Sequence, residues 1–463
     1  MNQKDFKKKI LVSVVTHLEL LVQMALYAAV WFGYYYPKII QYDTKLYFKG
    51  FVLILGIYLI LLYLFFNTYG GLKIGFMKSM DMSLSQMFGL ICTNVVTYFL
   101  LSLIHGWLVP VVPLLQATLV QVAVAVLWIL LSNRMYKKMF PPRKLLLIYG
   151  DRSIDDILFK FATRKDKFDI RKCIKVSEGT DKILDEIDSQ YDGVVLWDIP
   201  TADRNRLLKY CYSQSIRIYM MPKISDVIMM GSEALHLFDT PIVLTRETAL
   251  TVEQRFIKRC IDVICSVILL VLAFPFMLVT AIVIKAYDGG PVLYKQIRCT
   301  RDAKEFYILK FRSMRVDAEK DGVARLAAKN DSRITPIGKF IRAVRIDELP
   351  QLINILKGEM SFIGPRPERP EIIAQYVQEM PEFAFRTKVK AGLAGYAQVY
   401  GKYNTTPYDK LKLDLTYIEN YSVWLDIRLM LLTLKILLSP ESTEGVDSTQ
   451  VTAMKAGAEE ERK

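Results

Sequence analysis

The chain has few of the residues that build most transition-metal and redox sites. Only 3 histidines and 6 cysteines occur in 463 residues, and no two cysteines form a CxxC pair. A zinc site made from these side chains is therefore not expected, and we predict that the thiols are reduced. No internal repeat is visible either.

Long apolar runs are abundant, and 52% of the residues are hydrophobic. Such runs predict membrane spans when they reach about 20 residues. Four occur before residue 133, at roughly 11–32, 51–66, 87–108 and 111–131. Only Pro110 and its neighbours separate the last two runs. We therefore predict a four-helix transmembrane bundle whose third and fourth helices form a tight hairpin.

Basic residues predict the orientation of this bundle. The segments KDFKKK, before the first run, and NRMYKKMFPPRK, after the fourth, are strongly basic. The positive-inside rule then puts the N-terminus and the residues after 133 in the cytoplasm. The net charge is +14, and much of the excess flanks the apolar runs. We interpret it as serving to attract anionic lipid and phosphate ligands, so no nucleic-acid partner is expected. We expect no cleavable signal, because the first apolar run lacks a small-residue cleavage site.

Residues 143–222 alternate between strand-like and helix-like patterns. Strands such as KLLLIYG and GVVLWDIP alternate with helical segments such as ADRNRLLKYCYSQS. A β-α-β-α-β-α-β order of this kind predicts a small parallel sheet. The first turn, YGDRS, has one glycine instead of GxGxxG. This favours a structural or regulatory α/β domain over a dinucleotide site. Residues 223–251 are interpreted as a connector.

A fifth apolar run, 264–284, has Pro275 in its middle. Proline removes a backbone donor, so the helix should bend sharply there. A bent helix could enter and leave the membrane by the same face, whereas a straight one would be an ordinary fifth span. The residues alone leave these alternatives nearly even, although the basic segments that follow favour the cytoplasmic side.

Two adjacent carboxylates, Asp347 and Glu348, stand before a short apolar helix predicted at 349–357 and ended by Gly358. Such a pair can bind a divalent cation, or one carboxylate can act as a nucleophile. An isolated Asp-Glu pair is usually solvated surface. Here, six basic residues precede the pair and change that expectation: Lys310, Arg312, Arg315, Arg333, Arg342 and Arg345.

The turn FIGPRPERPE holds Arg366 between prolines. A stiffened arginine offers a planar donor fork for phosphate, although a proline-rich surface loop is an equal alternative. The glycine-punctuated AGLAGYAQVYGK follows, with Gln398. The next segment, PYDKLKLDLTYIENYSVWLDIRLMLLTLKILL, predicts one or two amphipathic helices. They would lie at a membrane interface or pack against the domain core.

At this point the sequence resembles the bacterial sugar transferase family, the monotopic phosphoglycosyl transferases that act on polyprenyl phosphate. The resemblance covers residues 250–440 and rests on IKRCIDVICSVILLVLAFPF, GGPVLYKQIR, YILKFRSM, RIDELPQLINILKGEMSFIGPRPERPE and GLAGYAQVYGK. The four spans and the α/β domain are similar in architecture to the large, exopolysaccharide-type members. The chain departs from the family at Thr300 and Ala303, where members usually have glycines, so the conformation of that loop is open.

The resemblance implies a reaction. A UDP-sugar would give sugar-1-phosphate to undecaprenyl phosphate, leaving UMP, in the first membrane step of exopolysaccharide, capsule or O-antigen synthesis. Asp347 would be the nucleophile that forms a covalent phosphosugar intermediate, and Glu348 would help to bind Mg²⁺. Lys310 and Arg366 occupy phosphate-contacting positions, and the helix with Pro275 would be re-entrant. We also predict substrate or phosphate binding by Arg312, Arg333, Arg342 and Gln398.

These inferences combine into one domain prediction. A transmembrane region (1–142) precedes a Rossmann-like α/β domain with its connector (143–250). A mostly α catalytic domain (251–440) follows, with a re-entrant helix at 258–285, and the tail (441–463) is disordered. The protein would be a homodimer in the bacterial inner membrane, contacting membrane lipid, with its catalytic domain on the cytoplasmic face. The sugar is open, with glucose or galactose as the first expectation. The alternatives are a non-enzymatic receptor or scaffold, and a transferase with five true spans.

Overall fold

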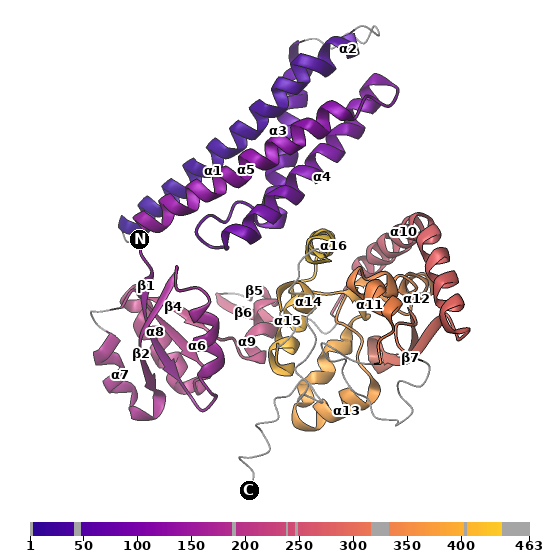
Figure 1. The fold of residues 1–463 in the computed structure, drawn as a ribbon. Helices are drawn as coiled ribbons and strands as arrows, with labels where there is room; N and C mark the ends of the chain where they lie inside the picture. Colours follow the sequence, from indigo (N-terminus) through magenta and orange to yellow (C-terminus); the bar gives the residue numbers. More distant parts are fainter. Residues whose placement is uncertain are drawn as a thin grey trace. The chain divides into compact units, whose positions relative to one another are not determined.

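The structure is a computed structural model that describes residues 3–40, 48–187, 191–237, 239–245, 249–315, 333–401 and 405–437. It divides into two compact units, Met1–Met221 and Pro222–Lys463. The first unit holds a helical bundle and an α/β domain, and the second is mostly helical (Figure 1). The predicted tail, 441–463, lies outside the described residues.

The first unit contains long apolar helices in the region where the sequence predicts a transmembrane bundle. The elements of this region are α1 (Gln3–Val30), the π-helix Trp31–Tyr35, α2 (Tyr36–Ile40), α3 (Phe48–Tyr69), α4 (Ser79–His105) and α5 (Val112–Met139). Helix α4 ends three residues earlier than predicted, because Gly106 takes the left-handed conformation that terminates helices. Helix α5 extends eight residues further, to Met139, with Lys137 and Lys138 in its last turn, where cations stabilise the helix dipole.

Polar side chains lie inside this apolar bundle and hydrogen-bond across its helices. Gln121 donates to the Tyr58 hydroxyl (2.8 Å), which donates to Asn94 (3.1 Å). Asn94 returns a hydrogen bond to the Gln121 amide oxygen (2.8 Å). The Gln23 side chain donates to the Gln121 backbone carbonyl (3.2 Å). In an apolar surrounding an unpaired amide is costly, so this network fixes which faces of the helices meet.

The α/β domain has the parallel sheet that the sequence predicts, with strand order β2-β1-β3-β4. Its strands and helices are β1 (Arg143–Tyr149), α6 (Asp155–Ala162), β2 (Phe168–Lys175), the 3₁₀ turn Val176–Glu178, α7 (Thr180–Ile187), β3 (Gly193–Trp197), α8 (Thr201–Ser213) and β4 (Arg217–Met220). A side chain at Gly150, the glycine of the first turn, would lie 2.0 Å from the Asp198 carbonyl oxygen. Close backbone packing therefore accounts for this glycine without a phosphate ligand.

The second unit begins at Pro222 and includes the whole of the segment interpreted as a connector, 223–251. That segment contains α9 (Ile224–Met230) and an antiparallel hairpin of β5 (Glu233–Leu237) and β6 (Thr240–Leu244). Val227 and Leu250 are buried in the core of the second unit. The remaining elements are α10 (Val252–Asp288), β7 (Leu293–Cys299), the 3₁₀ turn Arg301–Ala303, β8 (Glu305–Phe311), α11 (Pro336–Ala343), η4 (Ile346–Glu348), α12 (Gln351–Lys357), β9 (Ser361–Ile363), α13 (Pro370–Glu379), η5 (Pro381–Lys388), β10 (Gly392–Ala394), α14 (Tyr396–Tyr400), α15 (Pro407–Glu419) and α16 (Val423–Leu437).

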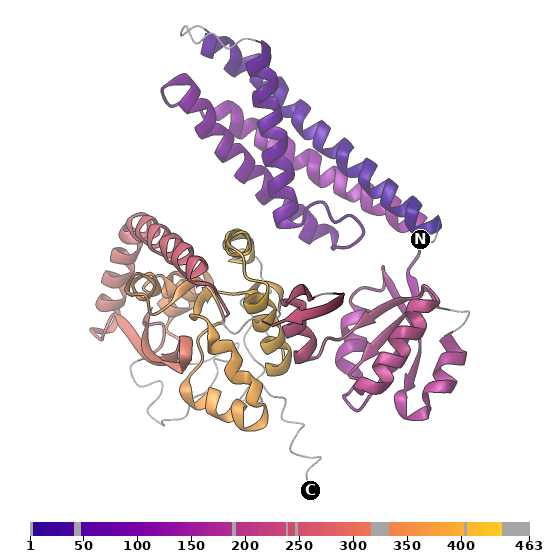
Figure 2. The same cartoon turned by 180° about the vertical axis from the view of Figure 1, so that it is seen from behind.

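Helix α10 is continuous across Pro275, and its ribbon bends sharply partway along (Figure 2). If straight, its 37 residues would span about 55 Å. Both of its ends nevertheless bind the same domain. Near its start, Asp262 accepts hydrogen bonds from the Ser361 hydroxyl and the Phe362 amide, each 3.0 Å long. At its end, Asp288 pairs with Arg312.

Of the two amphipathic helices predicted near the C-terminus, α15 packs on the core. Leu411 and Leu415 are almost fully buried. Helix α16 has one buried and one exposed face: Leu429 is buried, whereas Trp424 and Leu434 are about half exposed. Packing therefore accounts for α15 and one face of α16, and the other face of α16 keeps the composition of an interfacial helix.

In the β7–β8 connection, the backbone differs between Thr300 and Ala303, the two positions where glycine was expected from the resemblance. Ala303 has φ +56°, a left-handed conformation that favours glycine. Thr300 has φ −118°, so glycine is not needed there. Its hydroxyl donates to the Glu359 carbonyl (2.7 Å) and accepts from the Ala391 amide (3.1 Å). Glycine suits position 303, and threonine is the better residue at 300.

We expect Ala303→Gly to stabilise the second unit by about 0.5–1 kcal/mol, because it relieves a left-handed alanine at some cost in unfolded-state entropy. Thr300→Gly should destabilise it by about 2 kcal/mol, since it leaves a buried carbonyl and amide without their partner. The midpoints of thermal unfolding of the two detergent-solubilised variants provide the measurement. A lower midpoint for Ala303→Gly than for the unmodified chain would contradict this explanation of the loop.

Candidate active site

The Asp347–Glu348 pair is presented by a tight one-turn helix, η4, between α11 and α12. Arg345, just before η4, has φ +59° and ψ +18°, an unfavourable conformation for a long side chain. This reversal lets the chain leave α11 and turn at once into η4. Gly358, with φ +84°, ends α12 as predicted. The two carboxylates therefore stand on a backbone fixed on both sides.

Glu348 is the meeting point of three segments that are far apart in sequence. Its Oε1 accepts from Lys310 Nζ on β8 (3.0 Å) and from Arg366 in the Gly-Pro-Arg-Pro turn (3.1 Å). The Glu348 side chain is 14% exposed and that of Arg366 is 38% exposed. Of the predicted site residues, the structure thus brings Lys310, Glu348 and Arg366 into direct contact.

Asp347 differs from Glu348 in its hydrogen bonding. Asp347 is 8% exposed, and its Oδ1 atom is buried with no hydrogen-bond partner among the residues that the structure describes. Buried polar atoms are nearly always paired, so an unpaired carboxylate oxygen requires an explanation. Here it is an acceptor with free lone pairs, held beside a cationic cluster.

The two carboxylates have opposite pKa shifts. Burial, and then the charge of Glu348, raise the pKa of Asp347, while Lys310, Arg342 and Arg345 oppose the rise. Burial would also raise the pKa of Glu348, but Lys310, Arg366 and Arg345 outweigh it and hold the pKa well below its usual range. Glu348 therefore stays ionised and holds the cations, and Asp347 is the more basic of the two carboxylates.

Lys310 is held in place by a residue that the sequence analysis did not single out. Asn354, 1% exposed on α12, accepts from the Leu309 amide (3.0 Å) and donates to the Tyr307 carbonyl (2.8 Å). Its side-chain amide thereby satisfies the edge of β8. A polar residue in the apolar helix QLINILK was the available signal for such a role.

The Gly-Pro-Arg-Pro turn is fixed by two further arginines that the sequence analysis also missed. Arg386 donates to the Arg366 carbonyl (2.9 Å), and Arg298 donates to the Pro367 carbonyl (3.1 Å). Glu368, next in the chain, lies within 3.7 Å of both arginines. Burial opposes ionisation of Glu368, but Lys410, Arg386 and Arg298 lower its pKa to about 2. This ionised cluster holds the turn from behind, so that Arg366 faces Glu348.

The remaining predicted residues lie in different surroundings. Arg342 is on α11, close enough to influence the pKa of Asp347. Arg312 is 8% exposed and pairs with Asp288 at the end of α10. Arg333 adjoins the segment 316–332, which lies outside the described residues, and its carbonyl accepts from the Arg315 amide. On α14, the Gln398 amide oxygen is buried and unpartnered within the described residues. Substrate binding by these residues stays a prediction.

The donor set fits Mg²⁺. Mg²⁺ is usually held by one or two carboxylates, with substrate phosphates and water completing its octahedron. Asp347 Oδ1 and the Glu348 carboxylate supply those two groups. Within the described residues, no three or more His, Cys, Asp or Glu side chains gather as a metal cluster. Mg²⁺ binding stays a prediction.

Neutralising the two carboxylates should have opposite effects on stability. The pKa of Asp347 is raised in the folded state, so its ionised form destabilises the fold above that pKa. Asp347→Asn should therefore raise the midpoint of thermal unfolding near neutral pH. This gain should vanish on acidification, because Asp347 is then protonated in the unmodified chain as well. Glu348 has a lowered pKa, so Glu348→Gln should cost roughly 1–3 kcal/mol, below the range for fully buried pairs because Arg366 is 38% exposed. Thermal unfolding of both variants across pH provides the measurement, and a lower midpoint for Asp347→Asn at neutral pH would contradict the assignment.

The part of the chain that holds this site is similar to known proteins. The family described as "Bacterial sugar transferase" matches residues 253–440. A UDP-N-acetylgalactosamine-undecaprenyl-phosphate N-acetylgalactosaminephosphotransferase of Aeromonas hydrophila is 37% identical over 56% of this chain and 62% of its own length. A UDP-glucose:undecaprenyl-phosphate glucose-1-phosphate transferase of Escherichia coli is 36% identical over 47% of each chain.

A further relative is matched over more of its own length. The UDP-glucose:undecaprenyl-phosphate glucose-1-phosphate transferase of Caulobacter vibrioides is 37% identical over 190 residues, which are 40% of this chain and 71% of the relative. The longer relatives above are matched over about half to three-fifths of their length. The family match contains every residue of the site, from Lys310 on β8 to Gln398 on α14. The chain belongs to the bacterial sugar transferase family.

Proposed function

We propose that this protein transfers sugar-1-phosphate from a UDP-sugar to undecaprenyl phosphate, releasing UMP and leaving a polyprenyl-diphosphate-linked sugar. The observation that carries the proposal is the buried, unpartnered oxygen of Asp347 beside the Glu348–Lys310–Arg366 cluster. The acceptor is chosen because the names of the relatives above share undecaprenyl phosphate. Their sugars differ, so the donor sugar is left open, with glucose or galactose as the first to test.

In the first step, Asp347 attacks the phosphorus atom that carries the sugar. A bond forms between Asp347 Oδ and phosphorus, and the bond between phosphorus and the bridging oxygen breaks, so that UMP leaves with the electron pair. Asp347 Oδ1 is buried and accepts no hydrogen bond from any residue that the structure describes, which keeps the carboxylate basic and poorly solvated and so favours attack. Lys310 and Arg366 lie where they can offset the charge that develops on the phosphoryl oxygens.

In the second step, a phosphate oxygen of undecaprenyl phosphate attacks the same phosphorus atom. The Asp347–phosphorus bond breaks, and the carboxylate returns to its starting state. No proton transfer is needed in either step, because both nucleophiles are already anions. Mg²⁺ held by Asp347 and Glu348 would supply charge neutralisation for the diphosphate.

We further infer that α10 is a re-entrant helix and that the site lies at the cytoplasmic face of the inner membrane. The binding of both helix ends to one domain supports this, because a true span would separate them by the bilayer. Ile284 near the end of α10 packs in one cluster with Ile341 and Ile346. Ile346 precedes Asp347, so the membrane helix adjoins the nucleophile, where a lipid substrate arrives.

Asp347→Asn should reduce UMP release from a UDP-sugar by about 10³-fold or more, as removal of a nucleophile usually does. Intact-mass measurement without acceptor should detect a phosphosugar adduct on the unmodified chain and none on the variant. Asp302→Asn is the matched control, since Asp302 is an exposed carboxylate in the β7–β8 connection. If Asp347→Asn keeps full turnover, the protein is not a transferase of this mechanism, and a receptor or scaffold becomes the better account.

The re-entrant helix can be tested with cysteine labelling. Cys173 is exposed in the α/β domain, before α10, and Gln378 is exposed on α13, after it. A Gln378→Cys variant should react with a membrane-impermeant thiol reagent from the same side as Cys173, in sealed vesicles of both orientations. Reaction of the two positions from opposite sides would make α10 a fifth true span.

A further inference from the structure

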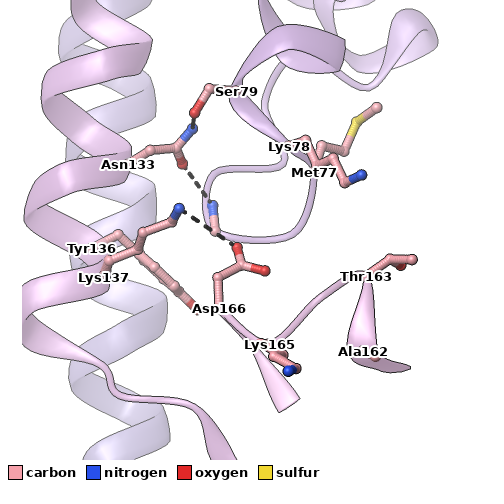
Figure 3. Close-up of a pocket in the computed structure, with 11 residues that line it drawn as sticks. Met77, Lys78, Ser79, Asn133, Tyr136, Lys137, Ala162, Thr163, Lys165 and Asp166 are labelled. Carbon is pink, nitrogen blue, oxygen red and sulfur yellow. Dashed lines mark hydrogen bonds and ion pairs between the residues drawn. The ribbon is translucent and has the colours of Figure 1, made fainter. Parts of the chain in front are cut away.

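A second polar site lies within the first unit. A cavity of about 330 Å³ opens between the α3–α4 loop, the end of α5 and the turn after α6 (Figure 3). That volume is within the range of small-ligand pockets. The residues around it are Gly75, Met77, Lys78, Ser79, Asn133, Tyr136, Lys137, Ala162, Thr163, Lys165 and Asp166.

The cavity carries an excess of positive charge. Lys78, Lys137 and Lys165 line it, and Asp166 is the one carboxylate in the lining. Asp166 is already engaged by Arg164 (3.1 Å) and lies 3.8 Å from Lys137. Lys78 and Lys165 have no side-chain hydrogen bond or ion pair with any other residue that the structure describes. Two ammonium groups at the cavity are thus unneutralised.

More cations stand directly behind the lining. The Lys167 ammonium lies over the Phe76 ring at 3.6 Å from its centroid. Burial, followed by the charges of Arg164, Lys8 and Arg143, lowers the pKa of Lys167 to about 8, with Asp166 opposing. Mutual repulsion among these groups raises the energy of the empty cavity, and an anion bound there would relieve it.

The walls of the cavity are fixed rather than formed by mobile side chains. Asn133 accepts from the Gly75 amide (3.2 Å) and donates to the Ser79 hydroxyl oxygen (3.0 Å). Gly75 has φ +69°, and a side chain there would lie 2.2 Å from the Tyr136 ring. Arg164 donates to the Phe76 carbonyl (2.5 Å) and ties the loop to the turn after α6. Ser79 accepts from Asn133, so its own hydroxyl proton is available to a ligand.

The position of the cavity indicates which anion it takes. Ser79 begins one candidate membrane span, and Asn133 and Lys137 lie in the last two turns of another. The cavity is therefore at the end of two spans, at the depth of lipid headgroups. Phe76 and Met80, on either side of Lys78, are 57% and 71% exposed, as expected beside acyl chains. We propose that this cavity binds the phosphate headgroup of an anionic membrane lipid.

The test uses the full chain in nanodiscs of phosphatidylcholine with a minor fraction of phosphatidylglycerol. Lipid that stays on the protein after transfer to detergent is counted by native mass spectrometry. The unmodified chain should retain phosphatidylglycerol in preference to phosphatidylcholine. The variant Lys78→Gln/Lys165→Gln should retain about tenfold less, as expected for removing two cations that face an anionic headgroup. Added inorganic phosphate should not displace the lipid.

The matched control is Lys182→Gln/Lys209→Gln, which removes the same charge from two exposed lysines of the α/β domain that are not in the cavity lining. It should retain phosphatidylglycerol like the unmodified chain. Equal retention by both double variants would overturn the proposal. Displacement by inorganic phosphate would also overturn it, in favour of a soluble anion. If the first double variant does not fold, Lys165→Gln alone, at an exposed turn, should still lose about fivefold.

Discussion

The second unit depends on one carboxylate, Glu348, which accepts from Lys310 and Arg366 at the same oxygen atom. These residues come from η4, β8 and the Gly-Pro-Arg-Pro turn, and no other single side chain in the site joins all three among the described contacts. A charge so little exposed is stable only when it is paired. The energetic need to neutralise Glu348 therefore assembles the site. The adjacent Asp347 keeps Oδ1 without a hydrogen-bond partner among the residues that the structure describes, so the two neighbouring carboxylates have different surroundings.

The residues that contact Glu348 are themselves held by a second set of side chains. Asn354 satisfies the edge of β8 behind Lys310, and Arg386 and Arg298 bind the carbonyls behind Arg366. Glu368 in turn neutralises those arginines. Each group is thus held by another behind it, so the side chains around Glu348 are largely preorganised. The family match covers all of these residues.

The helices and the parallel sheet could be predicted from the sequence because their signals are local. Apolar runs reveal the bundle, and alternating periods reveal the α/β domain. The Asp347–Glu348 pair and Arg366 were found in the same way, from unusual residues at short spacing. Arg386 and Asn354 were not, because their roles arise from contacts across 20 and 45 residues of sequence. The preference for glycine at position 303 follows from a left-handed backbone angle, which the periodicity of the sequence does not predict. The boundary near 250 was drawn from composition, whereas Val227 packs with the core of the second unit.

Helix α10 is fastened to its domain at Asp262 near one end and at Asp288 at the other. Each residue added to or removed from a helix rotates everything beyond it by about 100°. A single insertion or deletion between the two anchors would turn one of them away from its partner, even if every remaining side chain were unchanged. The number of residues between Asp262 and Asp288 is therefore constrained by helix geometry, just as the two residues themselves are constrained by their contacts with Ser361 and Arg312.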